Sequence, residues 1–399
     1  MHNFVNINIV QKYLTPINAA GSAENYITLL ANAWSDVVRG GQFADKALER
    51  LFRENKIADE EKRGLIATIF YDMLRNARLL QAISGSEEFG KLFVALQKLP
   101  NAVIANPFMQ NFKRAIRLSV PDWLDELGES ELGENWESIA NALLWRPQPV
   151  IRVNLRHCLR AELARKLSRR GFAPFVLEHN ICGIAVNSTG GLFSTEEFRS
   201  GLYEMQDAAS QEVALFCNVK PGMRVIDGCA GAGGKSLHLA DLMLNRGKII
   251  ALDIRENALV QLQKRAARAR IDIIETRHIA TTKVVKRLAG SADIVLLDVP
   301  CSGSGVFRRN PDAKWRLIPD DLTNLRQKQS EILEKYSKMA AINGRIVYSV
   351  CSIFPSEGEN QVLNFLNRNK GQFCLEDERR ISPVTGADGF YMARIKRTK

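Results

Sequence analysis

The first third of the chain has the hydrophobic periodicity of amphipathic helices. Apolar residues recur every three or four positions between about Tyr26 and Leu144, as in the stripe of Leu65, Ile66, Ile69, Phe70, Met73 and Leu74. Asp59 precedes this stripe and is followed by two glutamates, so it is expected to cap a helix with an acidic first turn. We therefore predict that residues 1–145 form an all-α domain.

The pattern changes at residues 146–149, where two closely spaced prolines are expected to end the helical region. The short apolar runs VIRVNL, FAPFVL and GIAVN predict strands. Between the first two runs lies a predicted helix rich in basic residues, namely Arg156, Arg160, Arg165, Lys166, Arg169 and Arg170. Residues 146–200 are therefore predicted to form a small α/β domain, whose basic helix is interpreted either as a solvated face or as an RNA contact.

From about Gly201, strand-like apolar runs alternate with helical stretches. The runs are MRVID (223–227), KIIALD (248–253), DIVLLD (293–298) and GRIVYSV (344–350). Such alternation is typical of a doubly wound parallel sheet, which binds its ligands at the carboxyl ends of the strands. Residues 201–399 are therefore predicted to be an α/β domain with a Rossmann-like sheet.

Charge and cysteine content narrow the function further. The 55 Lys and Arg residues exceed the 44 Asp and Glu residues, and the formal charge of +11 favours an anionic partner such as nucleic acid. The seven cysteines have neither C-x-x-C spacing nor a paired His-Cys array, so no metal site and no disulfide framework is expected. Residues 1–23 do not resemble a signal peptide, and no run is long enough to span a membrane, so the protein is expected to be cytoplasmic.

A glycine-rich turn follows the run MRVID directly. Glycines in GCAGAGGKS (228–236) allow the backbone to approach a ligand where a Cβ would collide. The turn departs from the P-loop pattern at Cys229 and from the dinucleotide pattern at Ser236, so a ligand without a phosphate, such as S-adenosylmethionine, suits it better. Asp253 ends the next strand, where a carboxylate can accept hydrogen bonds from ribose hydroxyls.

Two cysteines, Cys301 and Cys351, follow the ends of two predicted central strands. Their thiols are expected to converge beside the ligand, because the carboxyl ends of parallel strands share an edge. A thiolate that adds to carbon 6 of cytosine activates carbon 5 toward an electrophilic methyl group. Asp298 could hydrogen-bond the ring edge, and the second thiol is one candidate for removing the carbon 5 proton. The residues alone do not rank one cysteine above the other, whereas Cys158, Cys182, Cys217 and Cys374 are interpreted as small core residues.

Taken together, these segments resemble the RsmB/Nop family of RNA (cytosine-5)-methyltransferases. The matching segments are QDAASQ (206–211), DGCAGAGGKS (227–236), ALD (251–253), LLDVPCSGSGVFRRNPDAKW (296–315) and YSVCSIFPSEGEN (348–360). The resemblance implies a Rossmann-like methyltransferase sheet that binds S-adenosylmethionine through Cys229, Ala230, Gly231, Ala232, Gly233, Gly234, Lys235, Asp253 and Asp298. It further implies that Cys351 is the nucleophile, that Cys301 assists product release, and that Asp298 and Lys235 lie in the active site.

The chain departs from the family pattern at three places. Ala232 stands where the family usually has proline, and Val350 stands where it has threonine. The aspartate that family members place on the adenine side is absent from ETRHIATTKVVK, which has His278 near the expected position. We therefore assign no residue to that contact.

The helical region resembles the NusB-like domain that is fused to many bacterial members, and this implies ribosomal RNA as the substrate. The expected partner is thus RNA. The protein is expected to be a monomer and not to bind a membrane. Transfer RNA as the substrate, a non-catalytic ribosome assembly factor and a nicotinamide-dependent oxidoreductase are the alternatives. Trp315 is interpreted either as a stacking platform for RNA or as a core residue. The basic residues near it are interpreted either as phosphate contacts or as solvated charges, and they are Arg308, Arg309, Lys314 and Arg316.

Overall fold

The computed structural model describes residues 23–99 and 110–399. Its contacts divide the chain into two compact units. The first comprises Met1–Arg146 together with Val306–Leu317, and the second comprises Pro147–Gly305 together with Ile318–Lys399. One unit boundary therefore falls within the proline-containing stretch. The expectation that the chain begins without a signal peptide concerns residues that, apart from Ala23, lie outside the described ranges.

The first unit is helical. Its main helices are α2 (Ala23–Val38), α3 (Ala44–Glu54), α4 (Glu60–Arg75), α5 (Ala77–Ser84), α6 (Phe89–Gln97), α7 (Arg114–Arg117), α8 (Asp122–Leu132) and α9 (Trp136–Leu144). The predicted cap is confirmed, because the Asp59 carboxylate accepts hydrogen bonds from the backbone N–H groups of Glu61 (2.9 Å) and Lys62 (3.1 Å). The predicted stripe on α4 lies in the core of this unit, where Phe70 packs edge-on against Trp34 of α2.

The segment Val306–Leu317 was expected to belong to the sheet domain, but it belongs to the helical unit, where it contains helix α16 (Ala313–Arg316). The Lys314 ammonium donates to the carbonyl oxygen of Arg75 (2.7 Å), and the Trp315 indole N–H donates to that of Leu74 (2.8 Å). The C-terminal turn of α4 leaves these carbonyl groups without helical partners, so the two side chains satisfy them.

This placement bears on the two interpretations of the basic stretch after the Pro-Cys motif. Trp315 packs against the helical core, Arg308 is buried, and Lys314 is only 3% exposed. Burial lowers the pKa of Lys314 well below its ordinary value. These side chains therefore stabilise the helical unit, which favours the interpretation of Trp315 as a core residue and shows that Lys314 and Arg308 are not solvated charges.

The second unit contains a small antiparallel sheet in the order β2-β3-β1-β4. Its strands are β1 (Val150–Val153), β2 (Phe175–Val176), β3 (Gly183–Ala185) and β4 (Tyr203–Met205), with helices α10 (Arg160–Arg169) and α11 (Glu196–Arg199). The three predicted strands and the basic helix are present. β4, which the sequence did not reveal, pairs with β1.

Several basic residues of the small domain already have protein partners. Arg156 pairs with Asp241 (3.2 Å), Arg160 donates to the carbonyl of Leu177 (2.8 Å), and Arg170 pairs with Glu197 (2.8 Å). Lys166 pairs with Glu162 along α10 (2.8 Å). These contacts support the interpretation of the helix as a largely structural, solvated face.

The main sheet of the second unit has seven strands in the order β10-β11-β9-β8-β5-β6-β7. They are β5 (Arg224–Asp227), β6 (Lys248–Asp253), β7 (Ile274–His278), β8 (Ala292–Asp298), β9 (Ala340–Val350), β10 (Phe373–Ile381) and β11 (Phe390–Arg397). β9, β8, β5, β6 and β7 run parallel, and β11 and β10 continue the sheet antiparallel. The predicted Rossmann-like α/β fold is confirmed, with all four predicted strands in it.

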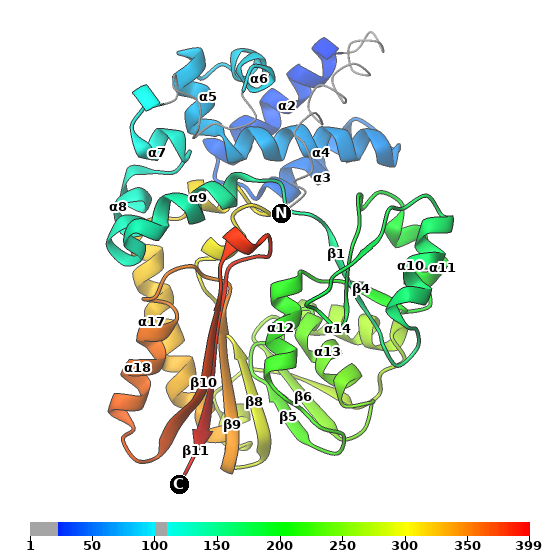
Figure 1. The fold of residues 1–399 in the computed structure, drawn as a ribbon, viewed down its shortest axis with the longest axis vertical. Helices are drawn as coiled ribbons and strands as arrows, with labels where there is room; N and C mark the ends of the chain where they lie inside the picture. The colour runs from blue at the N-terminus through cyan, green and yellow to red at the C-terminus, as the bar shows by residue number, and fades with distance from the viewer. Residues whose placement is uncertain (1–22, 100–109) are drawn as a thin grey trace. The chain divides into compact units, whose positions relative to one another are not determined.

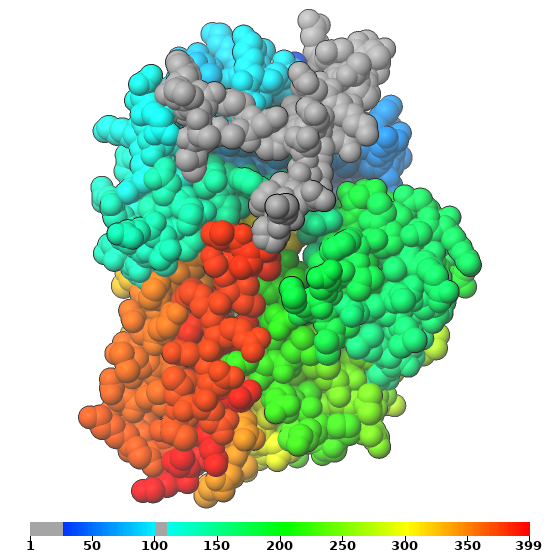
Figure 2. Space-filling view, viewed as in Figure 1, coloured from blue at the N-terminus to red at the C-terminus, as the bar shows by residue number. Residues whose placement is uncertain are grey.

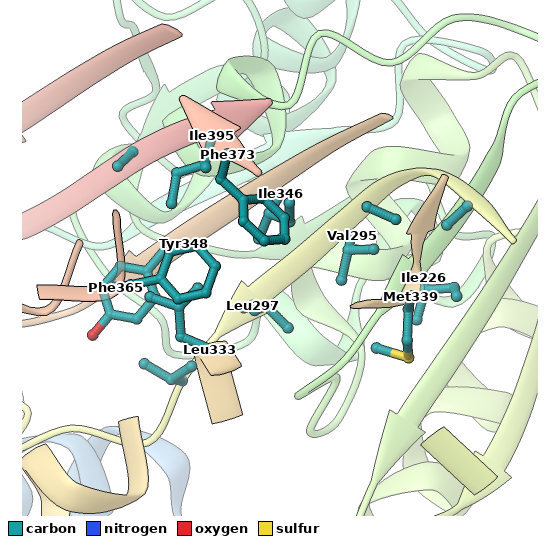
Figure 3. Packing of buried hydrophobic residues seen from close by; sticks show 14 of the residues in the cluster. Ile226, Val295, Leu297, Leu333, Met339, Ile346, Tyr348, Phe365, Phe373 and Ile395 are labelled. Atoms are coloured by element: carbon teal, nitrogen blue, oxygen red, sulfur yellow. The ribbon is translucent and has the colours of Figure 1, made fainter. Parts of the chain in front are cut away.

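Helices cover both faces of this sheet (Figure 1). They are α12 (Ala208–Phe216), α13 (Gly234–Leu242) and α14 (Glu256–Arg268) on one face, and α17 (Pro319–Tyr336) and α18 (Glu359–Arg368) on the other. On the second face, Leu333 and Phe365 pack against strand residues such as Val295 and Ile346 (Figure 3). Each Å² of apolar surface buried in this core stabilises the fold by about 25 cal/mol. The packed core therefore holds the strand ends in fixed positions.

The sequence missed β7 and the β10–β11 hairpin. In the space-filling view the red and orange atoms of this hairpin and α18 form one continuous surface (Figure 2). Cys374 lies on β10 and is exposed, so its interpretation as a core residue is wrong; Cys158, Cys182 and Cys217 are buried. Most side chains of β10 are exposed and many are charged, so the hairpin lacks a clear alternation of apolar and polar residues.

Within the described ranges, no helix is both long and apolar enough to cross a bilayer.

A close backbone approach leads to the first testable prediction. The Gly305 N–H donates to the Cys351 carbonyl (3.0 Å), and the Gly389 N–H donates to the Gly305 carbonyl (2.9 Å). A Cβ at residue 305 would lie 2.0 Å from the carbonyl oxygen of Gly389. We expect Gly305→Ala to lower the free energy of unfolding by about 3 kcal/mol, because the backbone must shift.

Gly64→Ala is the control, because a Cβ at this exposed position in α4 meets nothing within 4 Å. It should raise stability by about 0.5–1 kcal/mol through helix propensity. Chemical denaturation of both variants measures the two effects. Equal stability of Gly305→Ala and the unmodified protein would contradict the described backbone contact.

Candidate active site

Four parallel strands bring the predicted site residues to one edge of the main sheet. β5 ends at Asp227, β6 at Asp253, β8 at Asp298 and β9 at Val350. In the sheet register, Asp298 lies beside Ser349, and Cys351 follows two residues later. The structure thus brings together the carboxylates and thiols that the sequence placed at strand ends.

The glycine-rich turn is built from backbone contacts to the neighbouring strands. The Gly228 N–H donates to the carbonyl of Leu296 on β8 (2.8 Å), and the Ala230 N–H donates to that of Leu252 on β6 (2.9 Å). Gly233 caps α13 with a φ of 84°, and a Cβ there would collide with Leu262 of α14 at 2.4 Å. Glycine is therefore required at this position both for the backbone conformation and for helix packing.

Asp253 anchors this turn from the adjacent strand. Its carboxylate accepts hydrogen bonds from the backbone N–H groups of Gly231 (2.7 Å) and Arg255 (2.8 Å). His278, at the end of β7, is the sheet neighbour of Asp253, but its ring contacts the carbonyl of Ile254 (3.0 Å). The side chain at the position where the family aspartate is missing is therefore directed to the backbone of the next loop.

A pocket of about 250 Å³ lies beside the turn. Its lining combines turn residues with acidic, amide and basic side chains, namely Met205, Gln206, Asp207, Ser210, Asp227, Cys229, Ala230, Gly234, Lys235, Arg265 and Asp298. A Cβ at Gly234 would meet no protein atom within 4 Å, so the glycine leaves open space at the pocket wall. The lining holds three carboxylates against two basic side chains, and this excess of acidic groups fits a sulfonium cofactor.

Lys235 and Asp298 form a bound pair at the pocket. The Lys235 ammonium donates to one Asp298 oxygen (2.7 Å), and the Ser349 hydroxyl donates to the other (2.9 Å). Burial acts to lower the pKa of Lys235, but the charge and hydrogen bond of Asp298 outweigh it, so the pKa is raised. Lys235 is therefore a fixed positive charge, and its ammonium also lies 5.2 Å from the ring centre of Phe390.

The two predicted catalytic thiols are in contact. The Sγ atoms of Cys301 and Cys351 lie 3.3 Å apart, although the residues are 50 positions apart in the chain. The hydrogen bond with Cys351, burial, and the charge of Cys351 raise the pKa of Cys301 well above its ordinary value. Cys301 therefore stays protonated and can donate its hydrogen to the sulfur of Cys351.

Two further groups at the turn, Asp227 and Cys229, have raised pKa values. Burial raises the pKa of Asp227 to about 6, although the Ser236 hydroxyl donates to it at 2.6 Å. Burial and the charge of Asp227 raise the pKa of Cys229 well above its ordinary value, so this thiol is unreactive. Cys229 thus lines the pocket as a small neutral residue.

The sequence analysis did not assign several residues that the structure places at this edge. Gln206, Asp207 and Ser210 line the pocket, Ser349 binds Asp298, and Glu357 lies between the two cysteine loops. Gln206, Asp207 and Ser210 belong to the matched segment QDAASQ, so the family resemblance was a signal for them. Ser349 and Glu357 belong to the matched segment YSVCSIFPSEGEN, but only the fold shows that Glu357 lies next to both loops.

Family comparison covers the second unit and part of the first. Residues 214–396 match the family profile described as 16S rRNA methyltransferase RsmB/F. Residues 120–190 match the profile of the ferredoxin-like domain of RsmF/B-like methyltransferases. The two matches correspond to the main sheet and to the region around the small sheet.

Individual relatives agree with these profiles. The chain is 31% identical over 300 residues to "Probable ribosomal RNA small subunit methyltransferase B" of Synechocystis, covering 70% of this chain and 67% of that protein. It is 26% identical over 348 residues to ribosomal RNA small subunit methyltransferase B of Proteus mirabilis, covering 84% of this chain and 80% of that protein.

A solved structure supports the fold. The methyltransferase homologue from Pyrococcus horikoshii superimposes with a TM-score of 0.63 and 26% identity, covering 73% of this chain and 99% of that one. The similarity thus extends over most of the described chain, and the methyltransferase fold is shared.

The raised pKa of Asp227 predicts a pH effect on stability. Its folded-state pKa of about 6 lies above the ordinary value of 3.8, so the folded protein binds this proton more tightly than the unfolded chain. The resulting stabilisation is present below pH 3.8 and is lost as the pH rises through about 6. Asp227→Asn cannot ionise, so from pH 4 to pH 7 its free energy of unfolding should gain about 2–3 kcal/mol relative to the unmodified protein.

Denaturant unfolding at several pH values measures this difference. Asp293→Asn is a control, because Asp293 is an exposed residue of β8 that accepts a hydrogen bond from the Arg224 N–H. A constant difference between Asp227→Asn and the unmodified protein over this pH range would show that Asp227 ionises normally.

Proposed function

The chain belongs to the 16S rRNA methyltransferase RsmB/F family, and we propose that it methylates carbon 5 of a cytosine in ribosomal RNA through a covalent adduct with Cys351. The observation that carries this proposal is the contact between the two thiols, at 3.3 Å, beside the Lys235–Asp298 pair. Two thiols and one carboxylate are the groups that this chemistry needs.

The pocket beside the glycine turn would hold S-adenosylmethionine. In the proposal, residues 229–235 would surround the cofactor, Asp253 would accept from its ribose hydroxyls, and Asp298 would face its positive charge. Of these residues, Cys229, Ala230, Gly234, Lys235 and Asp298 line the pocket, whereas Gly231, Ala232, Gly233 and Asp253 do not. When bound, the cofactor supplies a methyl group on a positively charged sulfur. The backbone contacts of Asp253 keep the turn in place before the cofactor arrives, which lowers the entropic cost of binding.

The first step is addition of the Cys351 thiolate to carbon 6 of the cytosine. A bond forms between Sγ and carbon 6, the double bond of carbons 5 and 6 shifts to carbons 4 and 5, and ring nitrogen 3 gains the electron pair of its bond to carbon 4 and takes up the proton that the thiol gives up. The S–H group of Cys301 and the positive charge of Lys235 would stabilise the thiolate. Burial acts to lower the pKa of Lys235, but Asp298 and then Cys351 raise it, so Lys235 stays charged. Both neighbours favour Cys351 over Cys301 as the nucleophile.

Asp298 would orient the ring. Each of its oxygens already accepts one hydrogen bond, from Lys235 or Ser349, and each keeps a further lone pair. A cytosine edge presents N–H groups from the exocyclic amine and from nitrogen 3 once it is protonated. The carboxylate can accept these hydrogen bonds and stabilise the adduct.

Release of the product needs a base for the carbon 5 proton. The pKa of Cys301 is raised by its hydrogen bond with Cys351, by burial and by the charge of Cys351, so two of the three main causes come from Cys351. Once Cys351 is bonded to carbon 6, its sulfur is neutral, so these two effects weaken and Cys301 becomes more acidic. Cys301 can then give its own proton to solvent and take the proton from carbon 5, and the electrons of that bond form the double bond between carbons 5 and 6. The bond between Cys351 and carbon 6 breaks, and the departing thiolate takes up the proton that ring nitrogen 3 held.

The target cytosine must be accessible to a thiol that attacks ring carbon 6 from one side. A base inside a helix is stacked on both faces, so an unpaired or flipped-out nucleotide is required, at a cost of a few kcal/mol. The proposal therefore includes single-stranded loops of ribosomal RNA as substrates, met in the cytoplasm during assembly of the small subunit.

Methyl transfer to 16S ribosomal RNA tests the proposal directly. Purified protein, S-adenosylmethionine and unmodified 16S RNA are incubated, and the RNA is sequenced after bisulfite treatment. We expect one or few cytosines to become resistant to deamination. Methyl incorporation without any bisulfite-resistant cytosine would contradict carbon 5 as the target, and incorporation into transfer RNA alone would contradict the RNA class.

Single substitutions test the roles of the two cysteines. Cys351→Ala should abolish methyl transfer, because no nucleophile remains for carbon 6. Cys301→Ala should still add to the ring and methylate it, but a protein–RNA adduct should accumulate because the carbon 5 proton is retained. Denaturing gel electrophoresis with labelled RNA detects the adduct.

Cys374→Ala is the matched control, since Cys374 is exposed on β10 and should leave turnover unchanged. An adduct that persists in Cys351→Ala and disappears in Cys301→Ala would reverse the assigned roles.

A further inference from the structure

A buried glutamate lies between the two loops that carry the catalytic thiols. Glu357 is 0% exposed and follows the Cys351 loop, just before α18. One of its oxygens accepts the Ser302 N–H (2.9 Å) and the Gln329 side-chain N–H (2.9 Å). The other accepts the hydroxyl groups of Ser302 (2.5 Å) and Ser352 (2.6 Å).

The positions of these donors are informative. Ser302 is the residue after Cys301, and Ser352 is the residue after Cys351. A single carboxylate oxygen therefore binds the neighbour of each catalytic cysteine. Gln329 of α17 adds a third connection, because its amide also donates to the carbonyl of Pro300, the residue before Cys301.

The energetics indicate that Glu357 is more than a space-filling residue. Among the ion pairs of the described residues, none involves Glu357, so four neutral donors balance its negative charge. A buried carboxylate costs several kcal/mol unless its lone pairs are satisfied. Here all four donors come from the two loops and from α17, so the satisfied arrangement exists only when both loops are in place.

We propose that Glu357 is a positioning residue, which holds the Cys301 and Cys351 loops together so that their sulfur atoms remain in contact. The proposal rests on the proposed function for its effect on turnover, but the geometry of the thiol pair can be measured without it. The hydrogen bond with Cys351, burial and the charge of Cys351 are the main reasons for the raised pKa of Cys301. The negative charge of Glu357 raises this pKa further. Glu357 thus supports both the position and the protonation of that thiol.

Other contacts join the same loops but cannot replace this one. The hydroxyl groups of Ser304 and Ser352 lie 3.0 Å apart, and Arg380 donates to the carbonyl groups of Ser352 (3.1 Å) and Ile353 (3.0 Å). Arg380 itself pairs with Glu359. Like the bond between the Gly305 N–H and the Cys351 carbonyl, these bonds fix parts of the two loops, whereas the Glu357 carboxylate binds the residue after Cys301 and the residue after Cys351 at once.

The test replaces Glu357 with glutamine and compares it with Glu334→Gln. Glu334 lies on α17 and binds Asn369 (2.9 Å), away from the cysteine loops, so it controls for loss of a helical carboxylate. In Glu357→Gln the amide oxygen can still accept from the Ser302 N–H and from Gln329, but the amide N–H groups then face the hydroxyls of Ser302 and Ser352, which can no longer donate to residue 357. Ser352→Ala is a milder variant, which removes one donor and leaves the carboxylate.

The first measurement is thiol cross-linking. Diamide accepts two electrons and two protons from a pair of thiols, becomes a hydrazine, and leaves a disulfide. Peptide mapping by mass spectrometry follows the disulfide between Cys301 and Cys351 over time. We expect its formation to slow in Glu357→Gln, to slow less in Ser352→Ala, and to match the unmodified protein in Glu334→Gln, because a disulfide forms only over a narrow range of geometries.

The second measurement is steady-state methylation of 16S RNA. A misplacement of about 1 Å at reacting groups lowers turnover about 100-fold, so kcat should fall by about this factor in Glu357→Gln. KM for RNA and for S-adenosylmethionine should stay unchanged, because Glu357 does not line the pocket. The high-pH side of the rate profile should also move to lower pH, since a charge that holds the proton on Cys301 has been removed.

Three outcomes would overturn the proposal. They are cross-linking and turnover in Glu357→Gln equal to the unmodified protein, equal losses in Glu357→Gln and Glu334→Gln, or losses in proportion to the unfolded fraction measured by thermal melting. If Glu357→Gln does not fold, Ser352→Ala decides through the same cross-linking rate. If the unmodified protein methylates no cytosine, the proposed function fails, while the cross-linking comparison still tests the position of Glu357.

Discussion

The parallel pairing of β8 with β9 is the constraint on which the rest of the site depends. It sets Asp298 beside Ser349, and the chain then leads within three residues to Cys301 and within two to Cys351. A slip of one residue would turn Leu297 and Tyr348 out of the core and every side chain of the edge to the opposite face. The apolar core under the sheet therefore fixes the positions of the polar groups above it.

The carboxyl edge of the sheet holds several buried or half-buried carboxylates, and each accepts hydrogen bonds from neighbouring residues. Asp298 has Lys235 and Ser349, Asp227 has Ser236, and Glu357 has four donors. Buried charges are tolerated only in such arrangements, and they concentrate perturbed pKa values at one place. The same arrangements make the thiol of Cys301 hold its proton while Lys235 stays charged beside Cys351.

The basic residues illustrate how charge can be used for folding instead of recognition. Lys314 satisfies a helix-end carbonyl of the helical unit, Arg265 and Arg268 bind Glu204, and Arg156 binds Asp241. Such residues contribute to the formal charge of +11 without being available to RNA. A net charge therefore indicates the class of partner, whereas the contact surface has to be identified from individual side chains.

Local signals in the sequence were sufficient for the architecture. Helical periodicity and the cap at Asp59, four strand-like runs, and a glycine turn between a strand and a helix all depend on residues close in the chain, and the fold has them where they were predicted. The same signals placed Cys301 and Cys351 at one edge, because the edge of a parallel sheet follows from its topology. Tertiary structure alone decided the rest: the contact of two sulfur atoms 50 residues apart, the carboxylate of Glu357 between their loops, the return of Val306–Leu317 to the helical unit, and the exposed hairpin with Cys374. These features arise from side chains and backbones that meet only after the core has formed, so no pattern within a short stretch of sequence carries them.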